Sequence, residues 1–126
     1  MKRVSIGVVA NDGKVLLIKR KKQEGALLWQ FPGGQVESYE TSAEAAVREV
    51  NEETGIVCSP LLSLGQRMHP NTNIEIHYWA CEYITGEAFV KAPDEVSEIL
   101  WCEYDAIDHY ITTSIFPPIL DYLKTL

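Results

Sequence analysis

Residues 41–55 constrain the fold most, because they carry both the start signal and the stop signal of a helix. Thr41 followed three positions later by Glu44 forms the capping-box pattern of a helix N-terminus. Gly55 suits the left-handed position that ends a helix. The apolar residues between these signals recur at helical spacing: Ala43, Ala46, Val47 and Val50. The sequence therefore predicts a helix over residues 41–54 with one apolar face, which another layer of the protein has to cover.

Short runs typical of strands precede this helix. Val4–Ala10 and Val15–Lys19 predict two strands, and the Asn-Asp-Gly sequence at residues 11–13 is a hairpin signal between them. The polar and basic stretch Arg20–Leu28 is expected to be a loop. Trp29–Gly34, with the sequence WQFPGG, is expected to be a strand end that runs into a tight turn.

Further strands and two short helices follow the central helix. Alternating or apolar runs predict three strands: Leu61–Arg67, Ile74–Glu82 and Ile99–Glu103. Asp105–Tyr110 is expected to be a short helix, and Pro117-Pro118 opens a last helix. This order of elements predicts an α/β fold in which helices cover a sheet. The chain has 126 residues without an internal repeat or linker, so one domain over residues 1–126 is expected.

Composition narrows the class of protein. The formal net charge is −7, and nucleic-acid backbones favour clustered Lys and Arg, so nucleic acid is not expected as a partner. No apolar run is long enough to cross a membrane, and the apolar N-terminal run is broken too early for a signal peptide. Cys58, Cys81 and Cys102 have no metal-binding spacing and predict buried thiols in a reducing compartment, the cytoplasm.

The predicted helix concentrates negative charge on one side. Glu49 and Glu53 are four residues apart and Glu52 is three from Glu49, so the three carboxylates share one arc that borders the apolar stripe. Arg48 and Glu52 are also four residues apart, and we expect them to pair. Glu40 lies before the helix, in a loop that must fold back toward it. We therefore expect several carboxylates to lie close together at the edge of the core.

Such a cluster of hard oxygen ligands suits Mg²⁺ or Mn²⁺, which bind through a few carboxylates together with substrate phosphates. The Gly33-Gly34 turn lets backbone groups approach such a site closely. Taken alone, the pattern has a second interpretation, because Glu-rich helix faces are often simply exposed to solvent.

The spacing of these residues favours the metal-binding interpretation. Nine fixed or class-restricted positions follow in register: Gly34, five residues, Glu40, seven residues, Arg48, Glu49, Val50, one residue, Glu52, Glu53, one residue, Gly55 and Ile56. This pattern resembles the Nudix box, GX5EX7REUXEEXGU with U apolar, at every specified position. It covers about a fifth of the chain, and the preceding WQFPG is similar to the lead-in common in that family.

The resemblance implies the Nudix fold, an α/β/α sandwich with a mixed β-sheet flanked by helices. It implies a hydrolase that uses water to cleave a nucleoside diphosphate linked to another group, with Mg²⁺, or Mn²⁺ in its place, as cofactor. Glu49 and Glu53 would be the principal metal ligands, and the Gly33 carbonyl would complete the site. Glu52 would be a further ligand or the general base, oriented by Arg48.

Residues outside the box carry the remaining assignments. The other candidate for the general base lies in the loop before Trp101, where in similar MutT-like proteins an acidic residue reaches the metals, and Glu95 matches it best. Glu98 is the second choice for that role and is otherwise assigned to the substrate. Lys19 and Arg20 are predicted to bind substrate phosphates at the end of the second strand. Tyr78 is predicted to stack on a base, with core packing as the competing interpretation.

The short chain most resembles the MutT-like branch, so the expected substrate is an NTP or dNTP, released as monophosphate and pyrophosphate by a monomer or homodimer. MutT reads oxidised guanine with an Asn just before its last helix, and residues 112–118 contain no Asn, so that specificity is not implied.

One alternative is another Nudix substrate: ADP-ribose, a dinucleoside polyphosphate or a nucleotide sugar. The others are a nucleotide-sensing module, which usually lacks box glutamates, and an isomerase of the same fold, which needs a further Cys, His and Glu site.

Overall fold

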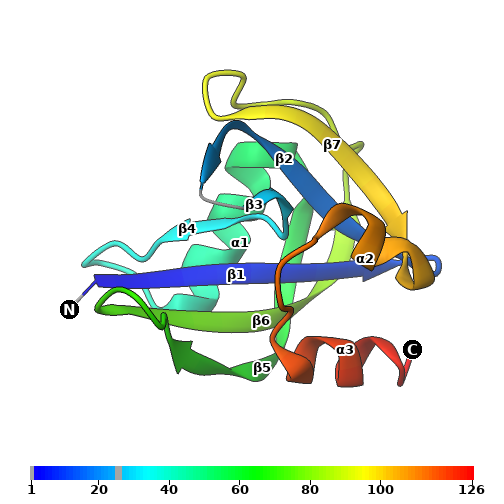
Figure 1. Ribbon diagram of the computed structural model, residues 1–126. Helices are drawn as coiled ribbons and strands as arrows, with labels where there is room; N and C mark the ends of the chain where they lie inside the picture. Colours follow the sequence, from blue (N-terminus) through cyan, green and yellow to red (C-terminus); the bar gives the residue numbers. More distant parts are fainter. Residues whose placement is uncertain (1, 25–26) are drawn as a thin grey trace.

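The computed structural model describes residues 2–24 and 27–126, and Figure 1 shows how their elements are arranged. In chain order these are β1 (Lys2–Asn11), β2 (Lys14–Glu24), β3 (Leu27–Gln30), β4 (Gly33–Gln35), α1 (Ser42–Thr54), β5 (Val57–Met68), β6 (Ile74–Thr85), β7 (Val96–Glu103), a 3₁₀ turn (Tyr104–Ala106), α2 (Ile107–Tyr110) and α3 (Pro117–Leu123). Among the described residues, no helix has the length and apolar character needed to span a membrane.

The strands form a mixed sheet in the order β3-β2-β1-β6-β5, with β4 paired to β1 and β7 paired to β2. β1 and β6 run parallel, from Lys2 opposite Ile74 to Ala10 opposite Glu82, whereas the other described pairs are antiparallel. β1 and β2 are therefore the two central strands, and each pairs with three others.

β1 and β2 are joined by the predicted hairpin turn but soon separate. Asp12 and Gly13 have positive φ values of 53° and 76°, as a two-residue type I′ turn requires. Ala10 lies opposite Val15 at the turn, and from there β1 pairs with β4 while β2 pairs with β7 and β3. The far halves of the two strands thus have different neighbours.

The segment between β3 and β4 crosses the gap that this separation opens. Gln30 lies opposite Ile18 on β2, whereas Gly33 lies opposite Ile6 on β1. The Gly7 amide donates a hydrogen bond to the Pro32 carbonyl at 2.9 Å, which fastens the crossing to β1. The crossing brings the glycine pair of β4 next to the end of β2, where the site described below is built.

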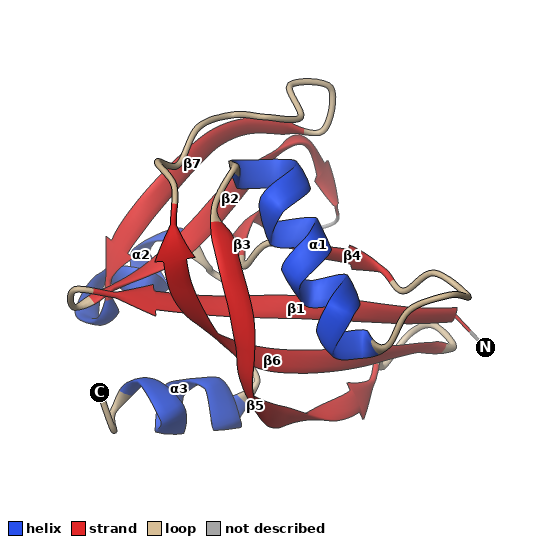
Figure 2. Ribbon diagram, turned by 180° about the vertical axis from the view of Figure 1, so that it is seen from behind, coloured by secondary structure: helices blue, strands red, loops and turns tan. Residues whose placement is uncertain are grey.

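α1 begins and ends where the sequence predicts. The Thr41 side chain accepts from the Glu44 amide, and the Glu44 side chain accepts from the Thr41 amide. Gly55 ends the helix with a φ of 77°. Figure 2 shows α1 lying across one face of the sheet, where Ala46 and Val50 are fully buried. They pack in one cluster with residues from four strands: Val9, Leu16, Cys58 and Cys81.

α2 and α3 lie on the opposite face, the near side in Figure 1. Their buried residues pack with side chains of the sheet: Ile107, Ile119 and Leu123 with Val8, Leu17, Phe31 and Tyr78. Because side chains alternate along a strand, Val8 and Val9 of β1 point into opposite layers. The predicted α/β/α sandwich with a mixed sheet is confirmed. The three cysteines are buried free thiols, as expected.

The expected loop Arg20–Leu28 is wrong over the described residues. β2 continues to Glu24 and β3 begins at Leu27, while residues 25 and 26 lie outside the described residues. β7 runs beside this stretch, with Arg20 opposite Val96. Strand hydrogen bonds come from the backbone, so a charged sequence can extend a strand when a partner is available. β5, β6 and β7 also extend beyond the predicted bounds.

Candidate active site

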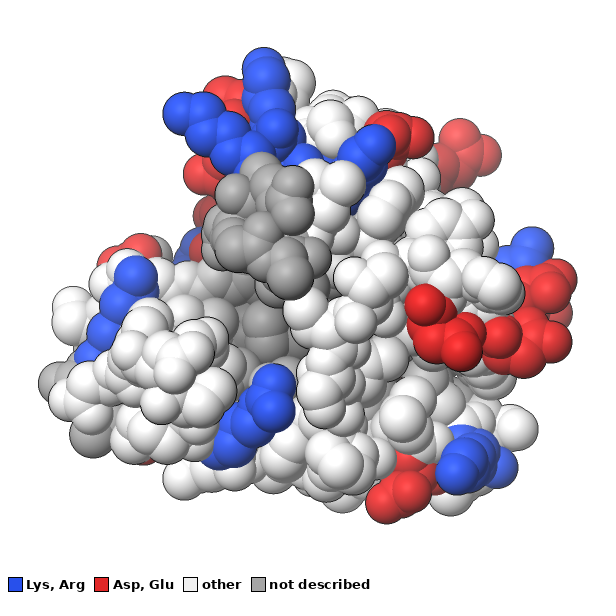
Figure 3. All heavy atoms as spheres, viewed as in Figure 1, with Lys and Arg blue, Asp and Glu red and all other residues white. Residues whose placement is uncertain are grey.

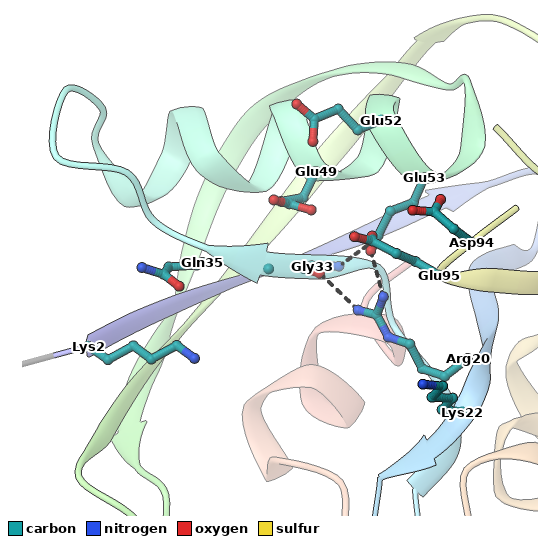
Figure 4. A pocket seen from close by; sticks show the side chains of 11 residues that line it. Lys2, Arg20, Lys22, Gly33, Gln35, Glu49, Glu52, Glu53, Asp94 and Glu95 are labelled. Atoms are coloured by element: carbon teal, nitrogen blue, oxygen red, sulfur yellow. Dashed lines mark hydrogen bonds and ion pairs between the residues drawn. The ribbon is translucent and has the colours of Figure 1, made fainter. Parts of the chain in front are cut away.

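Three glutamates of α1 mark the boundary between core and solvent. The exposed fraction of the side chain is 1% for Glu53, 14% for Glu49 and 56% for Glu52. Figure 4 shows Glu49 and Glu53 on the side of α1 that faces β4, whereas Glu52 lies farther from that strand. The predicted arc of carboxylates is therefore present, and one of its members is almost completely buried.

Glu53 is held by hydrogen bonds to β2 and β4. Its Oε1 atom accepts from the Gly33 amide at 3.0 Å, and its Oε2 atom accepts from Nη1 of Arg20 at 2.9 Å. Nη2 of Arg20 donates to the Gly33 carbonyl at 3.0 Å, which closes a ring of three residues (Figure 4). Burial raises the pKa of Glu53 to about 7, while the positive charge of Arg20 acts in the opposite direction.

Arg48 holds the remaining carboxylates of the cluster. It donates two hydrogen bonds to Glu40, at 2.6 and 3.0 Å, and one each to Glu49 at 2.8 Å and Glu52 at 3.1 Å. It also donates to the Gln35 carbonyl at 3.0 Å. The expected pair of Arg48 and Glu52 is confirmed, and the loop of Glu40 folds back onto α1. The hydrogen bonds from Arg48 lower the pKa of Glu40.

Gly34 leaves room for the Glu49 carboxylate. A Cβ atom on Gly34 would lie 2.5 Å from the carboxyl carbon of Glu49 and 2.7 Å from each of its oxygens. Burial raises the pKa of Glu49, although the hydrogen bond from Arg48 opposes this. The absence of a side chain at this position therefore lets a half-buried carboxylate lie directly against the backbone of β4.

These residues line a cleft of about 560 Å³, which we call the acidic cleft. Its walls come from α1, β4, the ends of β1 and β2 and the turn before β7: Lys2, Arg20, Lys22, Gly33, Gly34, Gln35, Glu49, Glu52, Glu53, Asp94 and Glu95. Acidic and basic side chains thus share one opening. No local motif marks Lys2 or Gln35 as lining residues, because their position depends on the pairing of β1 with β4.

The donor atoms of the acidic cleft suit a hard divalent cation, because they are all oxygens. They are the carboxylates of Glu49, Glu52 and Glu53 and the carbonyl of Gly33. Within residues 2–24 and 27–126, no three His, Cys, Asp or Glu side chains form a group that could hold one ion. The oxygens instead bind the guanidinium groups of Arg20 and Arg48. The chemistry of these oxygen ligands therefore suits a divalent cation. A bound cation would replace the contacts that the oxygens now make with Arg20 and Arg48.

The predicted residues outside the Nudix box lie at different places around the cleft. Glu95 lines it, together with Asp94. Lys19 and Glu98 face each other across β2 and β7 in an exposed ion pair of 3.0 Å and are not among the lining residues. Figure 3 shows basic and acidic side chains mixed at the top of the molecule, where β2 and β7 meet in Figure 1. A substrate-binding role of Lys19 and Glu98 stays a prediction.

Tyr78 is buried in the layer on the other side of the sheet. Its ring stacks on Phe116 with centroids 4.5 Å apart, and its hydroxyl accepts from Nε of Arg67 at 2.9 Å. Tyr78 lies opposite Ile6, which in turn lies opposite Gly33. Two strand spacings, about 10 Å, therefore separate the backbone of Tyr78 from that of Gly33.

Comparison with known proteins identifies the family. A model of the NUDIX domain matches residues 1–122. The chain belongs to the Nudix family. A MutT Nudix hydrolase from Burkholderia pseudomallei has the same fold, with a TM-score of 0.77 and 25% identity over 99% of this chain and 97% of that chain. CTP pyrophosphohydrolase of Escherichia coli is 30% identical over 100% of this chain and 93% of its own length. ADP-ribose pyrophosphatase of Methanocaldococcus jannaschii is 38% identical over 73% of this chain and 56% of its own length.

This Nudix protein is a hydrolase of pyrophosphate bonds and belongs to the MutT-like branch of its family. Nudix hydrolases generally depend on a divalent metal, which agrees with the oxygen donors of the acidic cleft. The glutamates of the box on α1 and the glycines before it line the same cleft.

The two glycines of β4 offer a matched pair of variants. A Cβ atom at Gly34 meets the movable end of Glu49, whereas at Gly33 it would lie 2.5 Å from the backbone oxygen of Ser5. We expect Gly34→Ala to displace Glu49 and weaken Mn²⁺ binding while changing the free energy of unfolding by less than about 1 kcal/mol. Gly33→Ala should destabilise the fold by about 1–3 kcal/mol or more. Calorimetric Mn²⁺ titration measures metal binding, and urea unfolding measures stability. Unaltered Mn²⁺ binding in Gly34→Ala would contradict the assignment of Glu49 as a metal ligand.

Glu53 makes the stability of the metal-free protein depend on pH. Its pKa is about 7 in the folded protein against an ordinary value of 4.5, so between these pH values the folded state holds a proton that the unfolded state has lost. Stability should therefore fall as the pH rises through this window, and Glu53 should add no further pH dependence below or above it. Thermal unfolding in EDTA measures the slope, which Glu53→Gln should reduce. An equal slope in both proteins would assign the effect to other groups.

Proposed function

We propose that the chain hydrolyses a nucleoside triphosphate, NTP or dNTP, to a nucleoside monophosphate and pyrophosphate with Mg²⁺ as cofactor. One observation carries the proposal: the acidic cleft places the carboxylates of α1 beside Arg20, Lys22 and Lys2. A polyphosphate bound together with divalent cations satisfies both kinds of charge, because the cations meet the carboxylates while phosphate oxygens meet the basic side chains.

Four groups would hold the metal. They are the carboxylates of Glu49, Glu52 and Glu53 and the carbonyl of Gly33, with Mn²⁺ able to replace Mg²⁺. When bound, the divalent cation neutralises charge on the phosphoryl oxygens and lowers the pKa of water. Arg48 is a positioning residue, since its contacts of 2.8 and 3.1 Å fix the carboxylates of Glu49 and Glu52.

Two carboxylates are candidates for the general base that takes the proton of the attacking water. Glu52 is engaged by Arg48 and is already assigned to the metal. Glu95 lines the acidic cleft from the turn before β7. We therefore assign the base to Glu95, with Glu52 as the second candidate.

The basic side chains and Tyr78 would bind the rest of the substrate. Arg20 and Lys22 line the cleft at the end of β2 and would contact phosphate oxygens. The backbone of Tyr78 lies about 10 Å from that of Gly33, but its ring is buried on the face of the sheet opposite α1 and stacks on Phe116, so its contact with a base stays a prediction. Lys19 and Glu98 would act only at the outer rim, where they now pair with each other.

The likeness to CTP pyrophosphohydrolase supports a triphosphate substrate, because it extends over nearly all of both chains. ADP-ribose is the second candidate, supported by the archaeal ADP-ribose pyrophosphatase, of whose length this chain matches 56%. The chain keeps every glutamate of the Nudix box, which disfavours a sensing module. A cytoplasmic location and a monomeric or homodimeric state stay predictions.

Product analysis tests the substrate. With Mg²⁺ and a panel of standard NTPs and dNTPs, 8-oxo-dGTP, ADP-ribose and diadenosine polyphosphates, we expect a monophosphate and pyrophosphate from at least one triphosphate. If ADP-ribose is the one compound cleaved, to AMP and ribose phosphate, the proposed site would stand and ADP-ribose would replace the triphosphate as the substrate. Metal binding without cleavage of any compound would favour the sensing module.

Glu53→Gln tests the assignment of the metal ligands. We expect kcat/KM to fall at least about a hundredfold, because a neutral amide is a poor ligand for a divalent cation. Glu44→Gln is the matched control, with the same chemical change on the same helix. Glu44 accepts from the Thr41 amide at 2.8 Å, a capping role that Gln also fills. Similar activity in the two variants would contradict the assignment of Glu53 as a metal ligand.

A further inference from the structure

Arg20 binds two of the oxygens that are proposed to hold the metal, one of Glu53 and one of Gly33. Its Nη1 atom binds Oε2 of Glu53 at 2.9 Å, and its Nη2 atom binds the Gly33 carbonyl at 3.0 Å. With the Gln30 amide turned so that its oxygen faces Arg20, this oxygen accepts from Nε and Nη2 at 2.8 Å each. All three nitrogens of the guanidinium are thus engaged, and 14% of the side chain is exposed.

The position of Arg20 follows from the charge of the site without metal. Glu53 is almost fully buried, and the carboxylate of Glu49 is close enough to raise its pKa further. A buried carboxylate left without a counter-charge is strongly destabilising. The guanidinium supplies that charge in a planar fork that matches two acceptors at once.

A guanidinium and a divalent cation would compete for these atoms. Oε1 of Glu53 already accepts from the Gly33 amide at 3.0 Å and Oε2 from Arg20 at 2.9 Å, so both oxygens of this carboxylate carry a donor. Two positive groups at the same oxygens would also repel each other strongly in a partly buried site. Metal binding through Glu53 and Gly33 is therefore expected to displace Arg20.

We propose that Arg20 is an exchangeable counter-ion that couples metal binding to phosphate binding. It holds Glu53 and the Gly33 carbonyl while the cleft is empty, and it turns into the cleft to bind substrate phosphate when a divalent cation takes those oxygens. The inference rests on the proposed function for the identity of the metal ligands. Its consequence is reciprocal: nucleotide should tighten metal binding, and metal should tighten nucleotide binding, through the same arginine.

Mn²⁺ titration of the nucleotide-free protein by calorimetry tests the exchange. Arg20→Ala removes the competitor, so it should bind Mn²⁺ at least about tenfold more tightly than the wild type. Lys22→Ala is the matched control, because it removes the same charge from the same cleft without touching Glu53 or Gly33. We expect its affinity to change much less. A non-hydrolysable nucleoside triphosphate should tighten Mn²⁺ binding in the wild type and much less in Arg20→Ala.

Each contrary outcome has a distinct meaning. Equal or weaker Mn²⁺ binding in Arg20→Ala, with binding lost in Glu53→Gln, would overturn the exchange and leave the proposed function in place. Mn²⁺ binding that Glu53→Gln does not affect would overturn both, because Glu53 would then not be a ligand.

A second measurement follows the wild-type protein itself, and a variant serves only to assign one signal. The chain has four arginines, so the Nε–Hε signals in a ¹⁵N NMR spectrum are few, and Arg20→Lys identifies the signal of Arg20. Saturating Mg²⁺ should shift this signal and speed its exchange with water, because the guanidinium leaves its acceptors. Arg67, which donates to Tyr78 in another layer, is the internal reference. An unchanged Arg20 signal with Mg²⁺ bound would overturn the exchange.

Discussion

Buried negative charge on α1 is the constraint on which the site depends. Glu53 is almost completely buried, and a carboxylate in such a place needs a partner. The chain supplies two arginines from different elements, Arg20 on β2 and Arg48 on α1. Each arginine also donates to a carbonyl of β4, one to Gly33 and the other to Gln35. The contacts that balance the charge therefore also fasten α1 and β2 to the glycine strand between them.

The parts of the site that could be predicted are those whose signals lie close together in the sequence. Thr41 and Gly55 set the ends of α1 through hydrogen bonds within a few residues, and the glutamates between them reach one face by helical spacing. The extension of β2 beyond Lys19 was not predicted, because its polar side chains give no strand signal and its partners come from β7 and β3: Arg20 lies opposite Val96, and Glu24 lies opposite Leu27. The partner of Arg20 was equally hidden, since Glu53 is 33 positions away and reaches it only across the strand crossing.

The two ends of the proposed substrate would contact different layers of the molecule. The phosphates would lie at the acidic cleft beside α1, whereas a nucleoside reaching Tyr78 would meet the layer of α2 and α3. Tyr78 is held there by Phe116 and Arg67, and neither residue lines the cleft. If Tyr78 contacted the base, the contacts to the base and the contacts to the phosphates would lie on opposite faces of the sheet.

The parallel pairing of β1 with β6 has a consequence for synthesis of the chain. Lys2 lies opposite Ile74, so β1 can pair with β6 only after 72 further residues have been synthesised. Contacts at such separations form slowly, and the ribosome delivers residues at about 5–20 per second, N-terminus first. For those seconds α1 has emerged without its complete sheet, and its apolar face has no finished surface to cover it. Until β6 has been synthesised, the apolar face of this acidic helix therefore cannot pack on the complete sheet.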